Sequence, residues 1–242
     1  MKKLILLFVF IPFLSNAQLL AGKNKIKVNL SSLAFNNYHA TYERSLTKRL
    51  SISLSYRYMS KQHIPLENAV KNYVDDPNLD LGTFMMGNNA ITPELRLYTG
   101  KGKGFYVAFY GRMANFDFTV PLKYQSSITS SPNTANFDGI IKSTSGGIMF
   151  GIQHNIAKAL VLDFWILGAH YGSSSGNLVA SNFDHTLTAY ERQSLQNAIN
   201  NFDASPFKIK GSVATDGKSA YIESDGPWAG VRGLGLSLGI KF

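Results

Sequence analysis

The sequence predicts an all-β protein, namely an eight-stranded antiparallel up-and-down transmembrane barrel with long outer loops that carry a short helix and a hairpin. Three observations lead to this prediction. Apolar and polar residues alternate with period two in eight segments of about ten residues, the length that a tilted strand needs to cross an outer membrane. The connections between these segments alternate between short and long. An apolar segment of the secretory type precedes them all.

The first segment has the features of a secretory signal. Two lysines precede an apolar run at residues 4–14, and the small residues of Ser-Asn-Ala follow at 15–17. The run is too short to span a bilayer as a helix, but it matches the core of a signal peptide. We therefore expect residues 1–17 to be a signal peptide and 18–242 to be an outer-membrane β-barrel domain. After cleavage near Ala17, the chain would reach the outer membrane of a Gram-negative bacterium.

Alternation defines each predicted strand in turn. In the clearest example, Leu50, Ile52 and Leu54 lie on one face and serines lie between them on the other. This pattern is typical of strands with one apolar and one polar side. The predicted strands are residues 26–35, 38–46, 50–59, 90–98, 104–116, 146–156, 160–169 and 233–242.

The connections differ in length in a regular way. Three of them are short turns, at residues 47–49, 100–103 and 157–159. The others are long: residues 60–88, an arm after the fifth strand that reaches beyond Ser130, and residues 173–228. Short periplasmic turns and long outer loops are typical of an outer-membrane barrel. A soluble exported barrel or sandwich is the alternative, but a sandwich would have loops of similar length.

The long loops contain local structure of their own. Residues 65–74 have the pattern of a short helix that begins at a proline. Thr188 and Glu191 have the spacing of a capping box at the start of a second helix. Residues 207–224 predict a hairpin around Asp-Gly at 216–217, which we place outside the membrane. These pieces either close the mouth of the barrel or dock a partner.

Charged residues lie on the face of the strands that would line the lumen. An eight-stranded barrel is just wide enough inside to be filled by side chains, so these charges would be buried together. Buried charges are tolerated when they are paired and hydrogen-bonded. The sequence therefore predicts a sealed polar plug, with a small-solute channel as the alternative. The predicted cluster consists of Glu43, Arg57, Glu94, Arg96, Arg112 and Asp163.

Two further strand features carry predictions. Pro93 cannot donate a ladder hydrogen bond, so we expect a β-bulge there that turns Glu94 into the lumen. The terminal strand, 233–242, would direct its leucines to lipid and pair with residues 26–35 to close the barrel. Its last residue, Phe242, fits the C-terminal signature of outer-membrane barrels, so we expect it to serve as an assembly signal.

No catalytic or metal site is predicted. His170, Ser173 to Ser175, Asp184 and His185 would be the candidates for an outer-membrane hydrolase acting at the rim, but their spacing matches no known nucleophile arrangement. Gly172 to Gly176 is predicted to be a flexible strand exit. The acidic stretch at 75–82 does not fit an EF-hand loop and is predicted to be a solvated turn. With zero Cys there is no disulfide, and no cofactor is expected.

The charge of the chain restricts the expected partners. The formal net charge is +9, but no run of Lys or Arg after the signal exceeds two residues, and an exported chain rarely meets nucleic acid. We expect instead an anionic membrane or a cell-surface polysaccharide. The predicted partners are outer-membrane lipid, the barrel-assembly machinery and an envelope protein bound through residues 60–88 and 173–228.

Four short motifs resemble those of a known family. The segments "KVNL" at 27–30, "YERSL" at 42–46, "PELRLY" at 93–98 and "LD" at 162–163 are similar to a family of small Gram-negative outer-membrane barrels catalogued as a domain of unknown function. The resemblance implies an eight-stranded membrane barrel and brings no established catalytic residues. We therefore expect a non-catalytic protein with a structural or partner-binding role, such as a subunit of a larger cell-envelope complex.

Overall fold

The computed structural model describes residues 22–63, 79–129 and 131–242. The predicted signal peptide at 1–17 and the predicted helix at 65–74 lie outside these residues. Antiparallel strands make up most of the described chain. The elements are β1 (Asn24–Asn29), α3 (Leu30–Leu33), β2 (Asn37–Ser45), β3 (Leu50–His63), β4 (Met85–Tyr98), β5 (Gly104–Tyr124), β6 (Asn133–Asn155), β7 (Leu160–Ala180), α5 (Ala189–Asn201), β8 (Lys208–Val213), β9 (Ala220–Arg232) and β10 (Gly235–Lys241).

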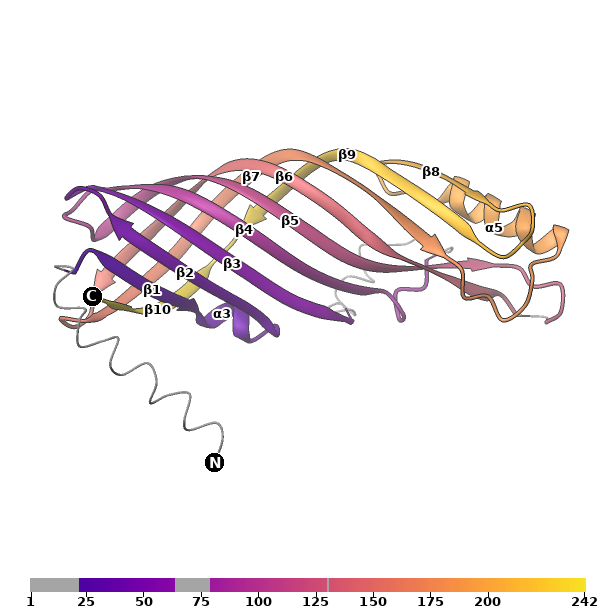
Figure 1. Ribbon diagram of the computed structural model, residues 1–242, viewed down its shortest axis with the longest axis horizontal. Coiled ribbons are helices and arrows are strands. Elements are labelled where there is room, and N and C mark those ends of the chain that lie inside the picture. The colour runs from indigo at the N-terminus through magenta and orange to yellow at the C-terminus, as the bar shows by residue number, and fades with distance from the viewer. Residues whose placement is uncertain (1–21, 64–78, 130) are drawn as a thin grey trace, which may run out of the picture.

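Eight of the strands form a ring. Strands β1 to β7 pair in chain order, and β10 pairs with both β7 and β1. At the seam, Ile240 of β10 lies opposite Ile26 of β1 on one side and Leu160 of β7 on the other. The predicted all-β antiparallel fold and the predicted pairing of the last strand with the first are confirmed. In Figure 1 the strands run obliquely across the molecule, with the short turns at the left.

The ring has an apolar outside and a polar inside. In β3, Ile52 and Leu54 are 45% and 53% exposed, whereas the intervening Ser51 and Ser53 are buried. The other strands of the ring follow the same rule, because successive side chains point to opposite faces of a strand. The predicted phase of the alternation is therefore confirmed along most of the ring. None of the helices in the described residues is long and apolar enough to cross a membrane.

The sheet continues well beyond the ring at the end opposite the short turns, which we call the extension. Strands β5 and β6 pair without interruption from Gly104–Gln153 to Tyr124–Asn133, so the predicted long arm after the fifth strand is wrong. The segment predicted to form this arm is instead paired as strand, because its inward-facing residues in the extension are apolar. Leu122 and Phe137 are fully buried in a core that also contains Leu195 of α5.

The predicted helix and hairpin of the last long segment are confirmed. Helix α5 begins with a capping box in which Thr188 and Glu191 bond each other's backbone N–H groups. Strands β8 and β9 form the hairpin, with Gly217 at a positive φ of 67° in its turn. Strand β9 then continues along β7 as far as the Gly168–Arg232 pair. Gly172 to Gly176 is therefore the middle of a paired strand, and the predicted flexible exit is wrong.

The first strand is shorter than predicted. It ends at Asn29, whose side-chain Oδ1 accepts a hydrogen bond from the Ser32 N–H at 2.8 Å and so caps the one-turn helix α3. Asparagine is a favoured N-cap because this bond satisfies an otherwise unpaired donor. The wall of the ring beyond Asn29 is consequently not built by β1.

The bulge predicted at Pro93 is wrong. The β4–β5 register is the same on both sides of the proline, since Ile91 lies opposite Met113 and Glu94 opposite Tyr110. Gly111 faces Pro93 and offers no side chain to displace, and even a Cβ added there would lie 4.0 Å from Pro93 Cγ. The register changes instead in the β3–β4 pair after Met59, and in the β6–β7 pair between Phe150 and Gly151, where β7 has one extra residue.

Candidate functional site

The interior of the ring near the short turns contains a network of buried charges. At its centre, Glu43 of β2 is fully buried and accepts hydrogen bonds from Lys25 and Lys27 of β1, each at 2.6 Å. Arg96 of β4 reaches the same carboxylate at 3.3 Å. Because strand alternation directs these side chains of β1, β2 and β4 inward, one carboxylate contacts three cations.

Two more carboxylates complete the network. Asp163 of β7 accepts from Arg96 Nη1 at 2.6 Å and also binds the Lys27 ammonium. Glu94 accepts from Arg96 Nη2 at 2.6 Å and from Arg232 Nη1 at 3.0 Å. Arg96 therefore binds all three carboxylates and connects β2, β4 and β7 across the ring. Buried ion pairs of this kind are stable only when most of their donors and acceptors are used.

Aromatic and amide side chains satisfy the remaining groups. The hydroxyl of Tyr98 donates to Glu43 at 2.9 Å, and the hydroxyl of Tyr106 donates to Asp163 at 2.8 Å. The guanidinium of Arg96 lies 4.7 Å from the centre of the Tyr106 ring, and Gln153 accepts from Lys27. These side chains are buried. The arrangement holds charge in fixed positions and fills the interior, and it leaves none of these carboxylates exposed for acid–base chemistry.

The structure brings together four of the six charges predicted to form this cluster: Glu43, Glu94, Arg96 and Asp163. Arg57 and Arg112 point inward as predicted, but no ion pair of theirs is found within the described residues. They lie nearer the extension because the strands are staggered around the ring, so inward residues of different strands meet at different heights.

The prediction missed three cations of the network. Lys25 and Lys27 alternate with the exposed Ile26 and Val28, so the period-two pattern could have identified them. Arg232 could not be found in this way. The chain is interrupted between β9 and β10. Alternation counted back from the terminal strand therefore places Arg232 on the outer face, although its side chain is buried inside.

The candidate hydrolase residues do not form one site. His170 lies midway along β7, not at its top, and its Nδ1 is 3.2 Å from the Tyr110 hydroxyl inside the molecule. His185 bonds Glu191 at 2.9 Å beside the start of α5. Ser173 and Ser175 are exposed on the outer face of β7. The histidines therefore have different partners on different elements.

The predicted turn in the acidic stretch lies partly outside the described residues. Within them, the carboxylate of Asp80 accepts hydrogen bonds from Gly82 and Thr83, as in an ordinary turn. Across the described ranges, no group of three or more His, Asp or Glu side chains is placed to hold a metal ion.

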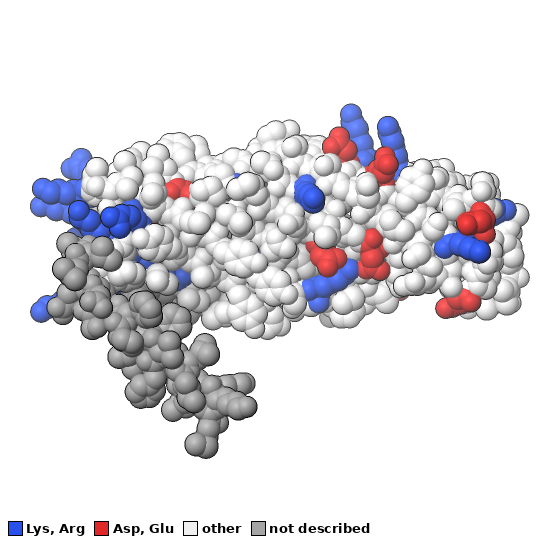
Figure 2. All heavy atoms as spheres, viewed as in Figure 1, with Lys and Arg blue, Asp and Glu red and all other residues white. Residues whose placement is uncertain are grey.

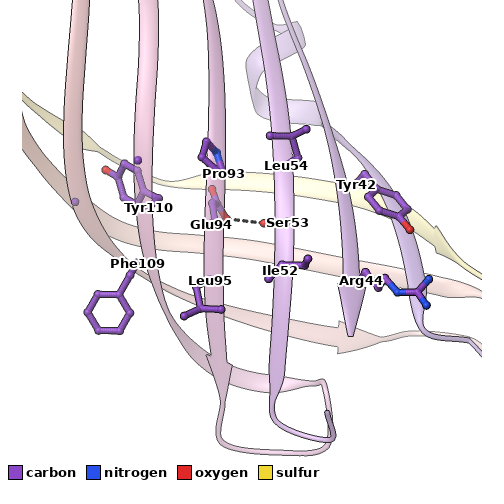
Figure 3. Close-up of a pocket in the computed structure, with 12 residues that line it drawn as sticks. Tyr42, Arg44, Ile52, Ser53, Leu54, Pro93, Glu94, Leu95, Phe109 and Tyr110 are labelled. Atoms are coloured by element: carbon purple, nitrogen blue, oxygen red, sulfur yellow. Dashed lines mark hydrogen bonds between the residues drawn. The ribbon is translucent and has the colours of Figure 1, made fainter. Parts of the chain in front are cut away.

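A large groove, of about 670 Å³, lies on the outer face of the ring over β2 to β5. Figure 3 shows Leu54, Leu95 and Phe109 along it, and Glu94 turned away to bond Ser53 inside. The groove forms where Pro93 faces Gly111, because neither residue has a long side chain to fill the space. Its lining is almost entirely apolar, which suits a hydrocarbon chain better than a polar substrate.

The last residue of the chain takes part in the seam. The N–H of Phe242 donates to the Asn24 carbonyl at 2.9 Å, and the Asn24 N–H donates to the Phe242 carbonyl at 3.0 Å. Phe242 as a whole is half-buried. Its assembly role remains a prediction.

Comparison with known proteins gives a family and no function. Residues 3–177 match the family described as "Protein of unknown function (DUF3575)". The matched region ends in β7, so α5, β8, β9 and β10 follow it. No curated protein and no solved structure matches the chain. The expected membership in a family catalogued as a domain of unknown function is confirmed, and the chain belongs to the DUF3575 family.

Proposed function

We propose that the protein is an outer-membrane β-barrel with a structural or partner-binding role and no catalytic activity. One observation carries this proposal: the ring is apolar on its outer face and charged inside, the reverse of a soluble protein. A soluble fold hides its apolar residues, and a monomer rarely exposes a contiguous apolar patch of more than a few hundred square ångströms.

The apolar outer face forms a band around the ring. In β5 the outward residues Phe105, Phe109 and Met113 are exposed and apolar, and polar residues begin only at Asn115 and Asp117. Figure 2 shows few charges on this part of the molecule, between the basic end at the left and a mixed group of charges near the middle. A band about nine residues long matches the height that a tilted transmembrane strand must cross.

The two borders of the band also suit a membrane. Tyr38, Tyr58 and Tyr171 are exposed toward the extension, where an aromatic girdle would lie in the headgroup region. At the opposite border the short turns and strand ends expose cations, and a basic surface attracts anionic lipid headgroups. These cations are Lys23, Arg44, Lys48, Arg49, Lys101, Lys103 and Lys158.

A matched pair of substitutions tests the membrane position. Leu95 and Val179 are similarly exposed, at 40% and 47%, but only Leu95 lies in the apolar band. Leu95→Arg should cost about 2–4 kcal/mol in a bilayer and reduce the folded, membrane-extracted protein. Val179→Arg should leave its amount unchanged. If both variants remained fully folded in the membrane fraction, the proposal would fail.

The filled interior supports a plug rather than a channel. Lys27, Arg96 and Tyr106 are at most 1% exposed and occupy the ring from different strands. A water-filled path would need space that these side chains occupy. We therefore expect no stable conductance in planar bilayers. Reproducible single-channel currents from the purified protein would favour the alternative, a small-solute channel.

The extension is the region that we propose to meet an envelope partner. It has its own hydrophobic core, built from β5, β6, β7, β9 and α5, which holds it rigid beyond the ring. Tyr190 and Tyr221 are exposed on it, at 59% and 47%. Exposed aromatic residues on a rigid surface are typical binding anchors.

Site-specific photocrosslinking in intact cells tests the partner-binding role. A crosslinker at Tyr190 or Tyr221 should give one discrete adduct, and a crosslinker at the exposed Lys101, at the other end of the molecule, should not give that adduct. If neither tyrosine position gave a discrete adduct, partner binding through the extension would be contradicted. Only the structural role would then remain.

A further inference from the structure

The interior also holds a group of three arginines toward the extension, and the charge network supplies a carboxylate partner to only one of them, Arg232. Arg57 of β3, Arg112 of β5 and Arg232 of β9 all line one cavity of about 230 Å³, together with Trp165 and His170. Arg232 binds Glu94, whose other oxygen is held by Arg96. Within the described residues no carboxylate pairs with Arg57 or Arg112, so the cavity has an excess of positive charge.

The cavity is also lined by hydrogen-bond donors that lack a protein acceptor in the part of the chain that the structure describes. These are Nδ2 of Asn29, Nε of Arg112, Nε1 of Trp165 and Nε of Arg232. Their side chains are deeply buried, with exposed fractions of 2%, 7%, 3% and 6%. Buried donors are costly to leave unpaired, and here they surround a space large enough for several atoms.

The donors are held rigidly. The guanidinium of Arg232 packs against two aromatic rings, 4.5 Å from the centre of the Trp165 ring and 4.8 Å from that of the Tyr110 ring. Tyr110 is itself tied to His170 by a hydrogen bond. Asn29 is fixed because its Oδ1 caps α3. Donors that are fixed in advance lose little entropy when a ligand binds.

The wall beside the cavity has a gap. Strand β1 ends at Asn29, and β8 pairs with β9 only as far as Asp225. Among the residues that the structure describes, the edge of β9 from 226 to 232 therefore has no strand beside it on that side. Val231 and Leu234 line the cavity there and are 71% and 72% exposed. A ligand could enter sideways through this gap, past an apolar margin.

We infer that this cavity binds a single phosphate group through Arg57, Arg112 and Arg232. Arginine suits a group with several anionic oxygens, because its planar fork can donate two parallel hydrogen bonds to them. The phosphate could be free, or it could be the headgroup of a lipid whose chains lie on Val231 and Leu234. The inference does not depend on where the protein is located.

Calorimetry on the purified full chain in non-ionic detergent tests the site. The probes are inorganic phosphate, dihexanoyl phosphatidic acid and, as the uncharged control, dihexanoylglycerol, all at constant ionic strength. Both phosphate probes should bind. Equal affinities assign the site to free phosphate, whereas phosphatidic acid at least tenfold tighter assigns it to a lipid headgroup.

Variants connect the binding to the named arginines. Arg57→Gln and Arg112→Gln should each weaken phosphate binding by roughly tenfold to a hundredfold, the usual effect of losing a charged hydrogen bond. Arg49→Gln, at an exposed turn arginine, should bind like the wild type. At the same concentration, phosphate should also raise the melting temperature of the wild type more than that of Arg112→Gln.

Three results would overturn the inference. One is no binding of either phosphate probe to the folded wild type. Another is unchanged binding in both Arg57→Gln and Arg112→Gln. The third is binding of dihexanoylglycerol as tight as that of phosphatidic acid. Arg57 is only half-buried, so its variant keeps the test valid if Arg112→Gln does not fold.

Discussion

Arg96 of β4 and Asp163 of β7 meet across the interior of the ring, with 2.6 Å between Nη1 and Oδ2, although 67 residues separate them in the chain. They do not belong to neighbouring strands, so this contact forms only when the ring closes. Lys27 binds the same Asp163 oxygen from β1. The ion network therefore depends on correct closure and fixes the relative positions of strands that do not pair.

Removing Asp163 should destabilise the protein strongly. In Asp163→Ala, Lys27 and Arg96 each lose a buried partner, and an uncompensated buried charge typically costs about 3–5 kcal/mol. Urea unfolding in detergent micelles, followed by tryptophan fluorescence, measures the change. Asp138→Ala is the matched control, because its ion pair with Lys61 is more than half exposed on the aspartate side and should contribute less than about 1 kcal/mol.

A double substitution separates charge from packing at the same site. Lys27→Met with Asp163→Leu removes one charge of each sign and keeps similar side-chain volume. The double variant should recover part of the stability lost in Asp163→Ala, because it removes a cation together with the carboxylate and so keeps the charge balance of the wild-type network. A double variant less stable than Asp163→Ala would show that the individual hydrogen bonds, rather than charge balance, hold the network together.

Gly151 should not tolerate a side chain. A Cβ at this position would overlap the buried Tyr106 ring, whose hydroxyl donates to Asp163. Gly151→Ala should therefore cost about 1–3 kcal/mol through overpacking. Gly233→Ala provides the comparison, because no atom of the described residues lies within 4 Å of a Cβ there. Equal unfolding midpoints for the two variants would mean that Tyr106 is not confined as described.

The start of α5 should lose stability in acid. Burial raises the pKa of Glu191, but hydrogen bonds from the backbone N–H groups of Thr188 and Ser127 outweigh it and hold the pKa well below its ordinary value. Unfolded α5 therefore binds the proton more readily than folded α5. The stabilisation of α5 by ionised Glu191 is complete above the unfolded-state pKa of about 4.3. It is lost as the pH falls below that value toward the folded-state pKa.

Hydrogen exchange tests whether α5 loses stability as the pH falls. Amide protection factors of α5, corrected for intrinsic exchange, should fall between pH 5 and pH 3 in the wild type. Glu191→Gln should be less protected at pH 5, by about 0.5–2 kcal/mol for a weakened cap, and should show little further change in acid. If the wild type and Glu191→Gln had the same pH dependence, another group would have to be responsible.

The terminal Phe242 offers a test of assembly separate from stability. Its backbone groups complete the seam with Asn24, so Phe242→Ala keeps both hydrogen bonds and removes only the ring. We expect less protein to reach the folded membrane form in cells, while the fraction that folds unfolds at an unchanged urea concentration. Ile240→Ala, two residues earlier and within β10, is the control. Equal yields for wild type and Phe242→Ala would remove the assembly role.

The ring was predictable because it is governed by local alternation. Residues such as Ile52 and Ser53 reveal their faces without knowledge of any neighbour. The extension was not predictable in the same way, because the apolar face is reversed within single strands. In β5 the outward Met113 is apolar in the ring, but the inward Phe116 and Leu122 are apolar in the extension. The reversal weakens the pattern at the point where the ring ends.

The site was only half predictable for a related reason. Alternation tells which residues point inward, and it placed Arg57 and Arg96 correctly. Alternation does not tell how far along the axis of the ring each residue lies, because this position depends on the stagger of the strands. Arg96 therefore falls within the ion network and Arg57 within the cationic cavity. The inward position of Arg232 could not be predicted without knowing that the chain is interrupted between β9 and β10.

The most direct test of the proposed membrane barrel uses the absence of cysteine in the chain. Single substitutions Leu95→Cys and Val179→Cys, labelled with bimane and reconstituted into vesicles of brominated lipid, report contact with acyl chains. We predict strong quenching at position 95, in the apolar band, and little at position 179, in the extension. Equal and weak quenching at both positions would contradict the account, because the band would then not face lipid.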